Sequence, residues 1–121
     1  MPIKKILVVE DSPTDRKVLA DILSSNGYSV STAGSAEEAL PKVKQEMPDL
    51  VLMDVVLPGQ NGYQATRAIS KDDATKHIPV IIVSTKGQET DRVWGMRQGA
   101  RDYIVKPVNS AELLAKISSL G

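Results

Sequence analysis

Three acidic side chains, one hydroxyl and one amine stand directly after short apolar runs of this sequence. Glu10 and Asp11 follow the first run, Asp54 follows a later one, and Ser84 and Lys106 follow the last two. Three carboxylates gathered in a small space raise one another's proton affinity unless a cation lies among them. Mg²⁺ prefers such hard oxygen ligands, so the acidic residues predict a magnesium site.

A carboxylate beside a metal ion, a lysine and a hydroxyl can accept a phosphoryl group. Asp54 is the expected nucleophile because it stands alone after its run, whereas Glu10 and Asp11 are adjacent and suit metal binding. Lys106 would neutralise one phosphoryl oxygen as a point charge, and Ser84 would donate a hydrogen bond to another. Each residue alone is ordinarily a solvated loop or capping residue, so the prediction depends on all of them meeting.

These residues meet only if the apolar runs are neighbouring parallel strands. Residues rich in β-branched types predict strands over 6–9, 50–53, 80–83 and 103–105, with a more alternating edge strand over 28–33. Segments of helical periodicity separate them, which predicts a doubly wound α/β fold with helices on both faces of a parallel sheet. Functional groups of such sheets collect beyond the carboxyl ends of the strands.

Capping patterns mark where three of the helices begin. They are Ser12 with Asp15, Ser35 with Glu38, and Asn109 with Glu112. The buried face expected for the first helix consists of Val18, Leu19, Ile22 and Leu23. Pro41 lies inside the second helix, where we expect it to kink the helix or to shift its start.

A single tryptophan lies in the fourth predicted helix, over about residues 90–98. With Val93 and Met96 facing the sheet, a 3.6-residue period turns Trp94 away from that face. An exposed tryptophan predicts a contact with a partner protein, unless rotation of the helix brings Trp94 into the core. His77 precedes the fourth strand, opposite the acidic residues, and is expected to be a loop residue.

Length and composition exclude several classes of protein. The 121 residues fit a single domain over 1–121. No Cys and one His exclude disulfides, thiolate zinc sites and sites that need two imidazoles. A net charge of zero argues against nucleic-acid binding. No apolar run approaches the roughly 18 residues of a membrane-spanning helix, and no signal peptide is recognisable, so we expect a cytoplasmic protein without membrane insertion.

Four motifs together resemble the signature set of the response-regulator receiver domain of bacterial two-component systems. They are Glu10-Asp11-Ser12, residues 53–62 (MDVVLPGQNG), Val83-Ser84-Thr85 and residues 103–107 (YIVKP). The resemblance covers essentially the whole chain. It implies a flavodoxin-like (βα)5 fold with strand order 2-1-3-4-5 and a cis peptide bond between Lys106 and Pro107.

The resemblance also implies a role for each residue of the site. Asp54 would accept a phosphoryl group from a sensor histidine kinase. Mg²⁺ would be held by Glu10, Asp11, Asp54 and the backbone carbonyl of Val56. Glu10 departs from the aspartate that is frequent in the family, but it still supplies an oxygen. Lys106 would bind the phosphoryl group, and the chain would catalyse only its own phosphorylation and dephosphorylation.

The same resemblance implies a conformational switch and a surface that binds a downstream partner. Ser84 would turn onto the phosphoryl group, and Tyr103 would follow it. The downstream protein partner would bind the fourth helix, the fifth strand and the fifth helix, with Trp94 and Tyr103 at the contact. We expect a monomer or a weak dimer. Residues 84–103 further resemble single-domain receivers of the chemotaxis-like pathways that control type IV pili and twitching motility.

Two residues near the acceptor bear on the lifetime of the phosphorylated form. Val56, two positions after Asp54, can neither donate to nor accept from an attacking water. Lys86, two positions after Ser84, either covers the phosphoryl group or points into solvent. We therefore expect slow self-dephosphorylation.

Other classes of protein fit the residues less well. A phosphatase of the haloacid dehalogenase type needs a second aspartate where Val56 stands. A flavin binder would have its phosphate repelled by Glu10 and Asp11, and a nucleotide hydrolase needs a glycine-rich Lys-Ser/Thr loop, which the sequence lacks. Two alternatives stay open: a scaffold that works without phosphorylation, and a receiver fragment of a longer regulator with an output domain.

Overall fold

Strands and helices alternate along the computed structural model, which describes residues 2–120. One parallel sheet, ordered β2-β1-β3-β4-β5, consists of β1 (Lys5–Val9), β2 (Ser29–Ala33), β3 (Leu50–Met53), β4 (Val80–Ser84) and β5 (Asp102–Val105). The helices that follow these strands are α1 (Pro13–Ser25), α2 (Ala36–Glu46), α3 (Gly62–Lys71), α4 (Glu89–Arg97) and α5 (Ser110–Leu120). The predicted fold and strand order are confirmed.

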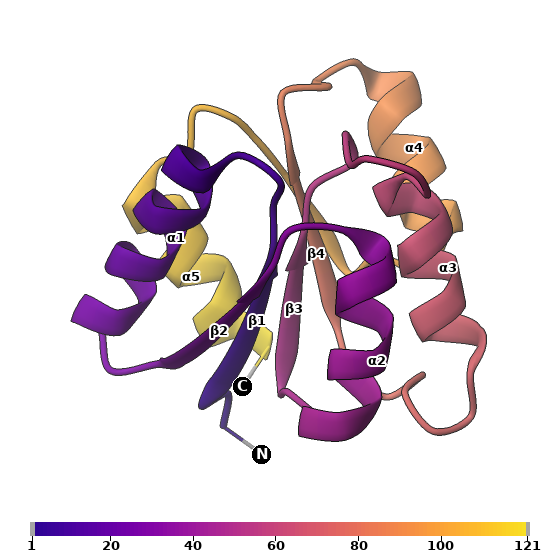
Figure 1. Cartoon of the computed structure of the whole chain (residues 1–121). Helices are drawn as coiled ribbons and strands as arrows, with labels where there is room; N and C mark the ends of the chain where they lie inside the picture. The colour runs from indigo at the N-terminus through magenta and orange to yellow at the C-terminus, as the bar shows by residue number, and fades with distance from the viewer. Residues whose placement is uncertain (1, 121) are drawn as a thin grey trace.

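Helices cover both faces of the sheet, α1 and α5 on one side and α2, α3 and α4 on the other (Figure 1). On the first side Leu23 of α1 and Ile117 of α5 pack against the apolar side chains of the inner strands. On the second side Val43 of α2 and Ile69 of α3 do the same. The inner strands are apolar throughout because both of their faces are covered, and each buried Leu or Ile stabilises the fold by about 1.5–3 kcal/mol.

The register of the strands brings the predicted site residues to one edge. Val9 of β1 pairs with Met53 of β3, so the next residues along the chain, Glu10 and Asp54, leave the sheet beside each other. Ser84 is the last residue of β4 and pairs with Val105, directly before Lys106. Pairing between parallel strands therefore places residues that are distant in sequence at one end of the sheet.

The predicted helix caps are present, although their acidic members do not reach back to the cap. Backbone N–H groups donate to Ser12 Oγ (3.3 Å), Ser35 Oγ (3.1 Å) and Asn109 Oδ1 (3.0 Å). Glu38 instead accepts from the backbone N–H of Gly34, at 3.0 Å. A complete capping box, which the sequence patterns did not single out, links Asn61 and Gln64 at the start of α3.

Of the two effects expected of Pro41, the shifted helix start is absent, because α2 begins at Ala36 behind its Ser35 cap and contains the proline. Two other expectations about the helices are wrong. Val18 is half exposed, because the buried face of α1 is narrower than predicted. Val93 and Met96 do not face the sheet either: both are exposed.

The contact of α4 with the sheet is made by its glycine. A Cβ built on Gly95 would lie 2.8 Å from Ile82 Cδ1 and 3.2 Å from the Tyr103 ring, so α4 packs closely through a residue without a side chain. Trp94 is 51% exposed, as predicted, although the helix is oriented differently. Within the part of the chain that the structure describes, no helix has the length and apolarity needed to cross a membrane.

Replacing Met47 with glycine should stabilise the protein. Met47 ends α2 in the left-handed region, at φ 48° and ψ 61°, which costs a residue with a Cβ about 1–2 kcal/mol. Glycine removes this cost, but its greater conformational freedom in the unfolded chain disfavours folding by about 0.5–1 kcal/mol. We therefore expect the free energy of unfolding to rise by up to about 1 kcal/mol. Urea denaturation measures it, and a lower midpoint than wild type would contradict the assignment of strain.

Candidate functional site

The three predicted metal ligands converge at the carboxyl ends of β1 and β3. One carboxylate oxygen each from Glu10, Asp11 and Asp54 lie within 4.8 Å of one another. Glu10 is 2% exposed and Asp54 is 6% exposed, whereas Asp11 lies at the surface. Clustered, partly buried carboxylates are the donor set that a hard divalent cation such as Mg²⁺ prefers, so the residues fit the implied metal.

Lys106 lies among these carboxylates and hydrogen-bonds to two of them. Its Nζ donates to Glu10 Oε2 at 2.5 Å and to Asp54 Oδ2 at 3.2 Å. Burial alone would lower the pKa of Lys106, but its hydrogen bonds to Glu10 and Asp15 and the charge of Asp54 raise that pKa above its usual range. The ammonium therefore stays charged and partly neutralises the cluster.

Asp15 is a member of the site that the sequence patterns assigned only to a helix cap. Its Oδ2 accepts from Lys106 Nζ at 3.0 Å, and its backbone N–H binds Ser12. The second half of the expected capping box is missing because the carboxylate faces Lys106. The only signal in the sequence was an acidic residue four positions after Asp11, and Asp15 and Lys106 are 91 positions apart in the chain.

Ser84 and Tyr103 are both tied to the backbone of Lys86. The Lys86 N–H donates to Ser84 Oγ at 3.3 Å, and the Tyr103 hydroxyl donates to the Lys86 carbonyl at 2.6 Å. Both side chains are buried. The loop after β4 is therefore held at one residue, Lys86, by two hydroxyls.

Val56 and Lys86 lie in the loops that follow β3 and β4. Val56 is exposed, and its backbone N–H donates to Asp54 Oδ1 at 3.3 Å. Lys86 is exposed as well. The residue whose backbone N–H binds Asp54 therefore has an exposed apolar side chain, which offers no hydrogen bond to water.

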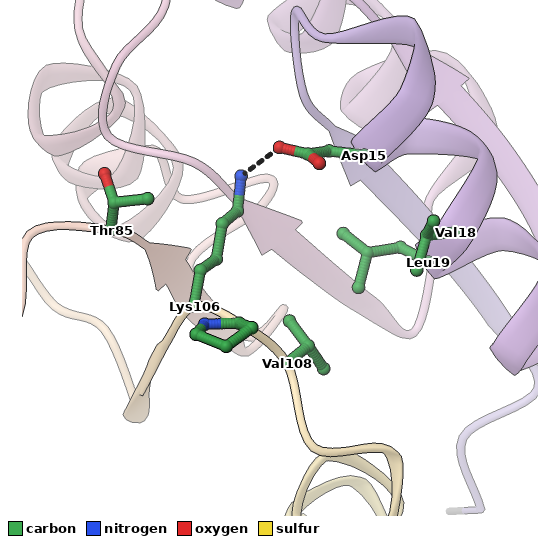
Figure 2. Close-up of a pocket in the computed structure, with 7 residues that line it drawn as sticks. Asp15, Val18, Leu19, Thr85, Lys106 and Val108 are labelled. Atoms are coloured by element: carbon green, nitrogen blue, oxygen red, sulfur yellow. Dashed lines mark hydrogen bonds and ion pairs between the residues drawn. The ribbon is translucent and has the colours of Figure 1, made fainter.

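A groove of about 450 Å³ borders the site between α1 and the loop after β5. Figure 2 shows Asp15 and Lys106 joined across it, with Val18 and Leu19 on one wall and Val108 on the other. The peptide bond between Lys106 and Pro107 is cis, as predicted. His77 lines a separate cavity with Asp49 and Arg101 and is not part of the site.

The metal-free protein should lose stability as pH rises from about 5 to about 8. Burial raises the pKa of Glu10 from 4.5 to about 7; the hydrogen bond from Lys106 opposes this rise and Asp54 adds to it. A raised pKa gives stability that is complete below about pH 4.5 and lost as pH passes about 7. We expect a decrease of up to about 3 kcal/mol in the free energy of unfolding.

Chemical denaturation at several pH values without divalent ions checks this dependence. Glu38, Asp49 and Asp72, whose pKa values are lowered by hydrogen bonds to backbone N–H groups, affect stability only at lower pH. Glu10→Gln should abolish the slope between pH 5 and pH 8, since it leaves nothing to titrate at this position. An equal slope in the variant would show that another group is responsible.

Comparisons with known proteins agree with this geometry. A family model described as the response regulator receiver domain matches residues 6–118. Protein PilH of Pseudomonas aeruginosa is 52% identical over 116 residues, which cover 96% of each chain. Several other relatives are longer, and this chain spans only 26% to 51% of their length.

Two solved structures are similar in fold and hold ligands. The receiver domain of the Pseudomonas aeruginosa sensor histidine kinase PA1611, with a magnesium ion in its active-site cleft, has a TM-score of 0.89, 32% identity, and coverage of 96% of this chain and 95% of its own. The CheX-CheY-BeF3-Mg²⁺ complex of Borrelia burgdorferi gives a TM-score of 0.91 and 32% identity, covering 97% of this chain and 88% of that one.

Proposed function

The chain belongs to the response regulator receiver domain family, and on that basis we propose that Asp54 accepts a phosphoryl group from the phosphohistidine of a sensor kinase. One observation carries the proposal: a buried aspartate lies within a set of carboxylates suited to Mg²⁺, at 3.2 Å from a lysine ammonium. Ser84, a buried hydroxyl at the end of the neighbouring strand β4, would donate a hydrogen bond to the added group.

The transfer exchanges one bond to phosphorus for another. An Asp54 carboxylate oxygen attacks the phosphorus, the new P–O bond forms as the P–N bond breaks, and the electron pair leaves with the imidazole nitrogen, which takes a proton from water. Glu10, Asp11, Asp54 and the Val56 carbonyl would hold Mg²⁺, which supplies charge neutralisation when bound. Lys106 stabilises the negative charge that remains on the phosphoryl oxygens.

Phosphorylation would then change the surface formed by α4, β5 and α5. The phosphoryl group adds negative charge and acceptor oxygens next to Ser84. When Ser84 Oγ turns to donate to one of them, it no longer accepts from the Lys86 N–H. Lys86 also binds the Tyr103 hydroxyl, so the populations of the loop and of the Tyr103 environment shift together.

A protein partner would bind to the surface altered in this way. Trp94 projects from α4 and supplies a large apolar anchor, and the CheY of the Borrelia burgdorferi complex is bound to CheX. Similarity to PilH and to receivers of type IV pilus pathways supports a role in the control of motility. Family membership favours the cytoplasm as the place of phosphotransfer.

Intact-mass measurement with a small phosphodonor tests the phosphotransfer. Wild type incubated with acetyl phosphate and Mg²⁺ should gain the mass of one phosphoryl group, and Asp54→Asn, which has the same shape without a nucleophilic carboxylate, should gain none. EDTA should prevent the gain in wild type. An unchanged mass of wild type, or an equal gain in both proteins, would favour the scaffold that works without phosphorylation.

The phosphorylated form should decay slowly. Val56 borders Asp54 with an exposed apolar side chain, and it offers neither a donor nor an acceptor to an attacking water. Val56→Asn adds both and should shorten the lifetime. The decay of the phosphorylated mass after removal of the donor, with Mg²⁺ present, measures the effect; loss of the phosphoryl group from wild type within seconds would refute the prediction.

A further inference from the structure

Asp15 is positioned to compete with the phosphoryl group for Lys106. It lies in the first turn of α1, and its Oδ2 accepts from Lys106 Nζ at 3.0 Å across the groove next to Pro107 (Figure 2). The carboxylates that could hold a metal ion together belong to Glu10, Asp11 and Asp54, and Asp15 is not among them. Asp15 therefore contacts the phosphate-binding lysine from outside the metal site.

All three hydrogens of the Lys106 ammonium have carboxylate acceptors. Glu10, Asp15 and Asp54 accept at 2.5, 3.0 and 3.2 Å, and an ammonium has three donors and no more. A phosphoryl oxygen that binds Lys106 must therefore replace one of these carboxylates.

Exposure decides which carboxylate gives way. Phosphorylation makes Asp54 an acyl phosphate, which no longer carries a carboxylate charge and which brings several phosphoryl oxygens toward Lys106. Of the two carboxylates that remain, the Glu10 side chain is 2% exposed and would lose a charge-assisted hydrogen bond in a place that water barely reaches. The Asp15 side chain is 47% exposed, so water can solvate its carboxylate once the hydrogen bond to Lys106 is broken. Asp15 is thus the acceptor that is released at the lowest cost.

We propose that Asp15 occupies the third donor of Lys106 in the resting protein and is displaced by a phosphoryl oxygen when Asp54 is phosphorylated. This inference rests on the proposed function. It makes Asp15 a positioning residue that acts through Lys106: its ion pair favours the resting state and opposes the phosphorylated one. If Asp15 instead anchored Lys106 in place for the phosphoryl group, removal of Asp15 would weaken binding of that group rather than strengthen it.

Binding of beryllofluoride in saturating Mg²⁺ measures the competition without a chemical step. Calorimetric titration should give a dissociation constant about two- to fivefold lower for Asp15→Asn than for wild type, which is the range of a partly exposed ion pair. Asp15→Ser should behave likewise, and Asp15→Glu should restore the wild-type value. Mg²⁺ affinity without beryllofluoride should stay within about twofold of wild type, since Asp15 lies outside the metal cluster.

Asp21→Asn is the matched control, because it removes the same charge from α1 at a residue paired with Lys17. Its beryllofluoride affinity should equal that of wild type. Equal or weaker binding by both Asp15→Asn and Asp15→Ser, or equal tightening in Asp21→Asn, would overturn the competition. Absence of beryllofluoride binding by wild type, matched by Asp54→Asn, would instead contradict the proposed function itself.

Discussion

Replacing Gly62 with alanine should destabilise the protein by about 2–4 kcal/mol and misplace Asp54. Gly62 begins α3, and its N–H donates to the Val55 carbonyl at 2.9 Å. A Cβ built on it would lie 1.9 Å from the carbonyl oxygen of Asp54 and 2.8 Å from Val55 Cα. These neighbours are backbone atoms, so the clash is relieved only by movement of the loop that carries Asp54.

Gly34→Ala is the control for this substitution. Its Cβ would meet Arg16 Nη1 at 3.1 Å, the end of a flexible side chain, so we expect a loss below about 1 kcal/mol. Urea denaturation and the rate of Mg²⁺-dependent phosphorylation should be measured on both variants. Gly62→Ala with wild-type stability and rate would show that the loop yields easily and that the close approach has no consequence.

Replacing Lys106 with methionine should tighten Mg²⁺ binding while it abolishes most phosphotransfer. The ammonium hydrogen-bonds to the Glu10 and Asp54 carboxylates at 2.5 and 3.2 Å, so it repels a cation that binds the same oxygens. Its loss should raise Mg²⁺ affinity by about tenfold or more. It should also slow phosphorylation by about 10²-fold, the usual cost of removing one group that stabilises the transferring charge.

The metal-free Lys106→Met protein should also be less stable, by about 1–3 kcal/mol, because two buried carboxylates lose their counter-charge. Protonation of Glu10, whose pKa is already about 7, limits this loss. Lys116→Met removes the same charge from a surface pair with Asp102 and should leave Mg²⁺ affinity and phosphorylation rate unchanged. Weaker or unchanged Mg²⁺ binding in Lys106→Met would contradict the electrostatic account of the site.

The parts of the site that lie at strand ends could be predicted from sequence. Glu10, Asp54, Ser84 and Lys106 each follow an apolar run, and parallel pairing such as Val9 with Met53 brings them together. Local sequence contains this information because a strand covered on both faces is a recognisable apolar run. The strand order itself came from resemblance to a family, since spacing alone does not determine it.

Contacts between elements that are distant in sequence could not be predicted from the sequence patterns. The local sequence predicts only that Asp15 belongs to a capping box. Its pairing with Lys106 depends on how α1 packs beside the loop after β5. The orientation of α4 was predicted wrongly because periodicity favours large apolar residues such as Val93 for the buried face. The helix instead approaches Tyr103 through Gly95, whose missing side chain gives no signal of burial.

Chemical trapping of the phosphorylated residue tests the central claim most directly. An aspartyl phosphate is an acyl phosphate, and borohydride reduces it to the alcohol, which converts the aspartate into homoserine. After treatment with acetyl phosphate and Mg²⁺, peptide mass mapping should find homoserine at position 54, and EDTA should prevent its formation. Homoserine at another position, or an unaltered Asp54 in protein that has gained a phosphoryl group, would contradict the assignment of Asp54 as the acceptor.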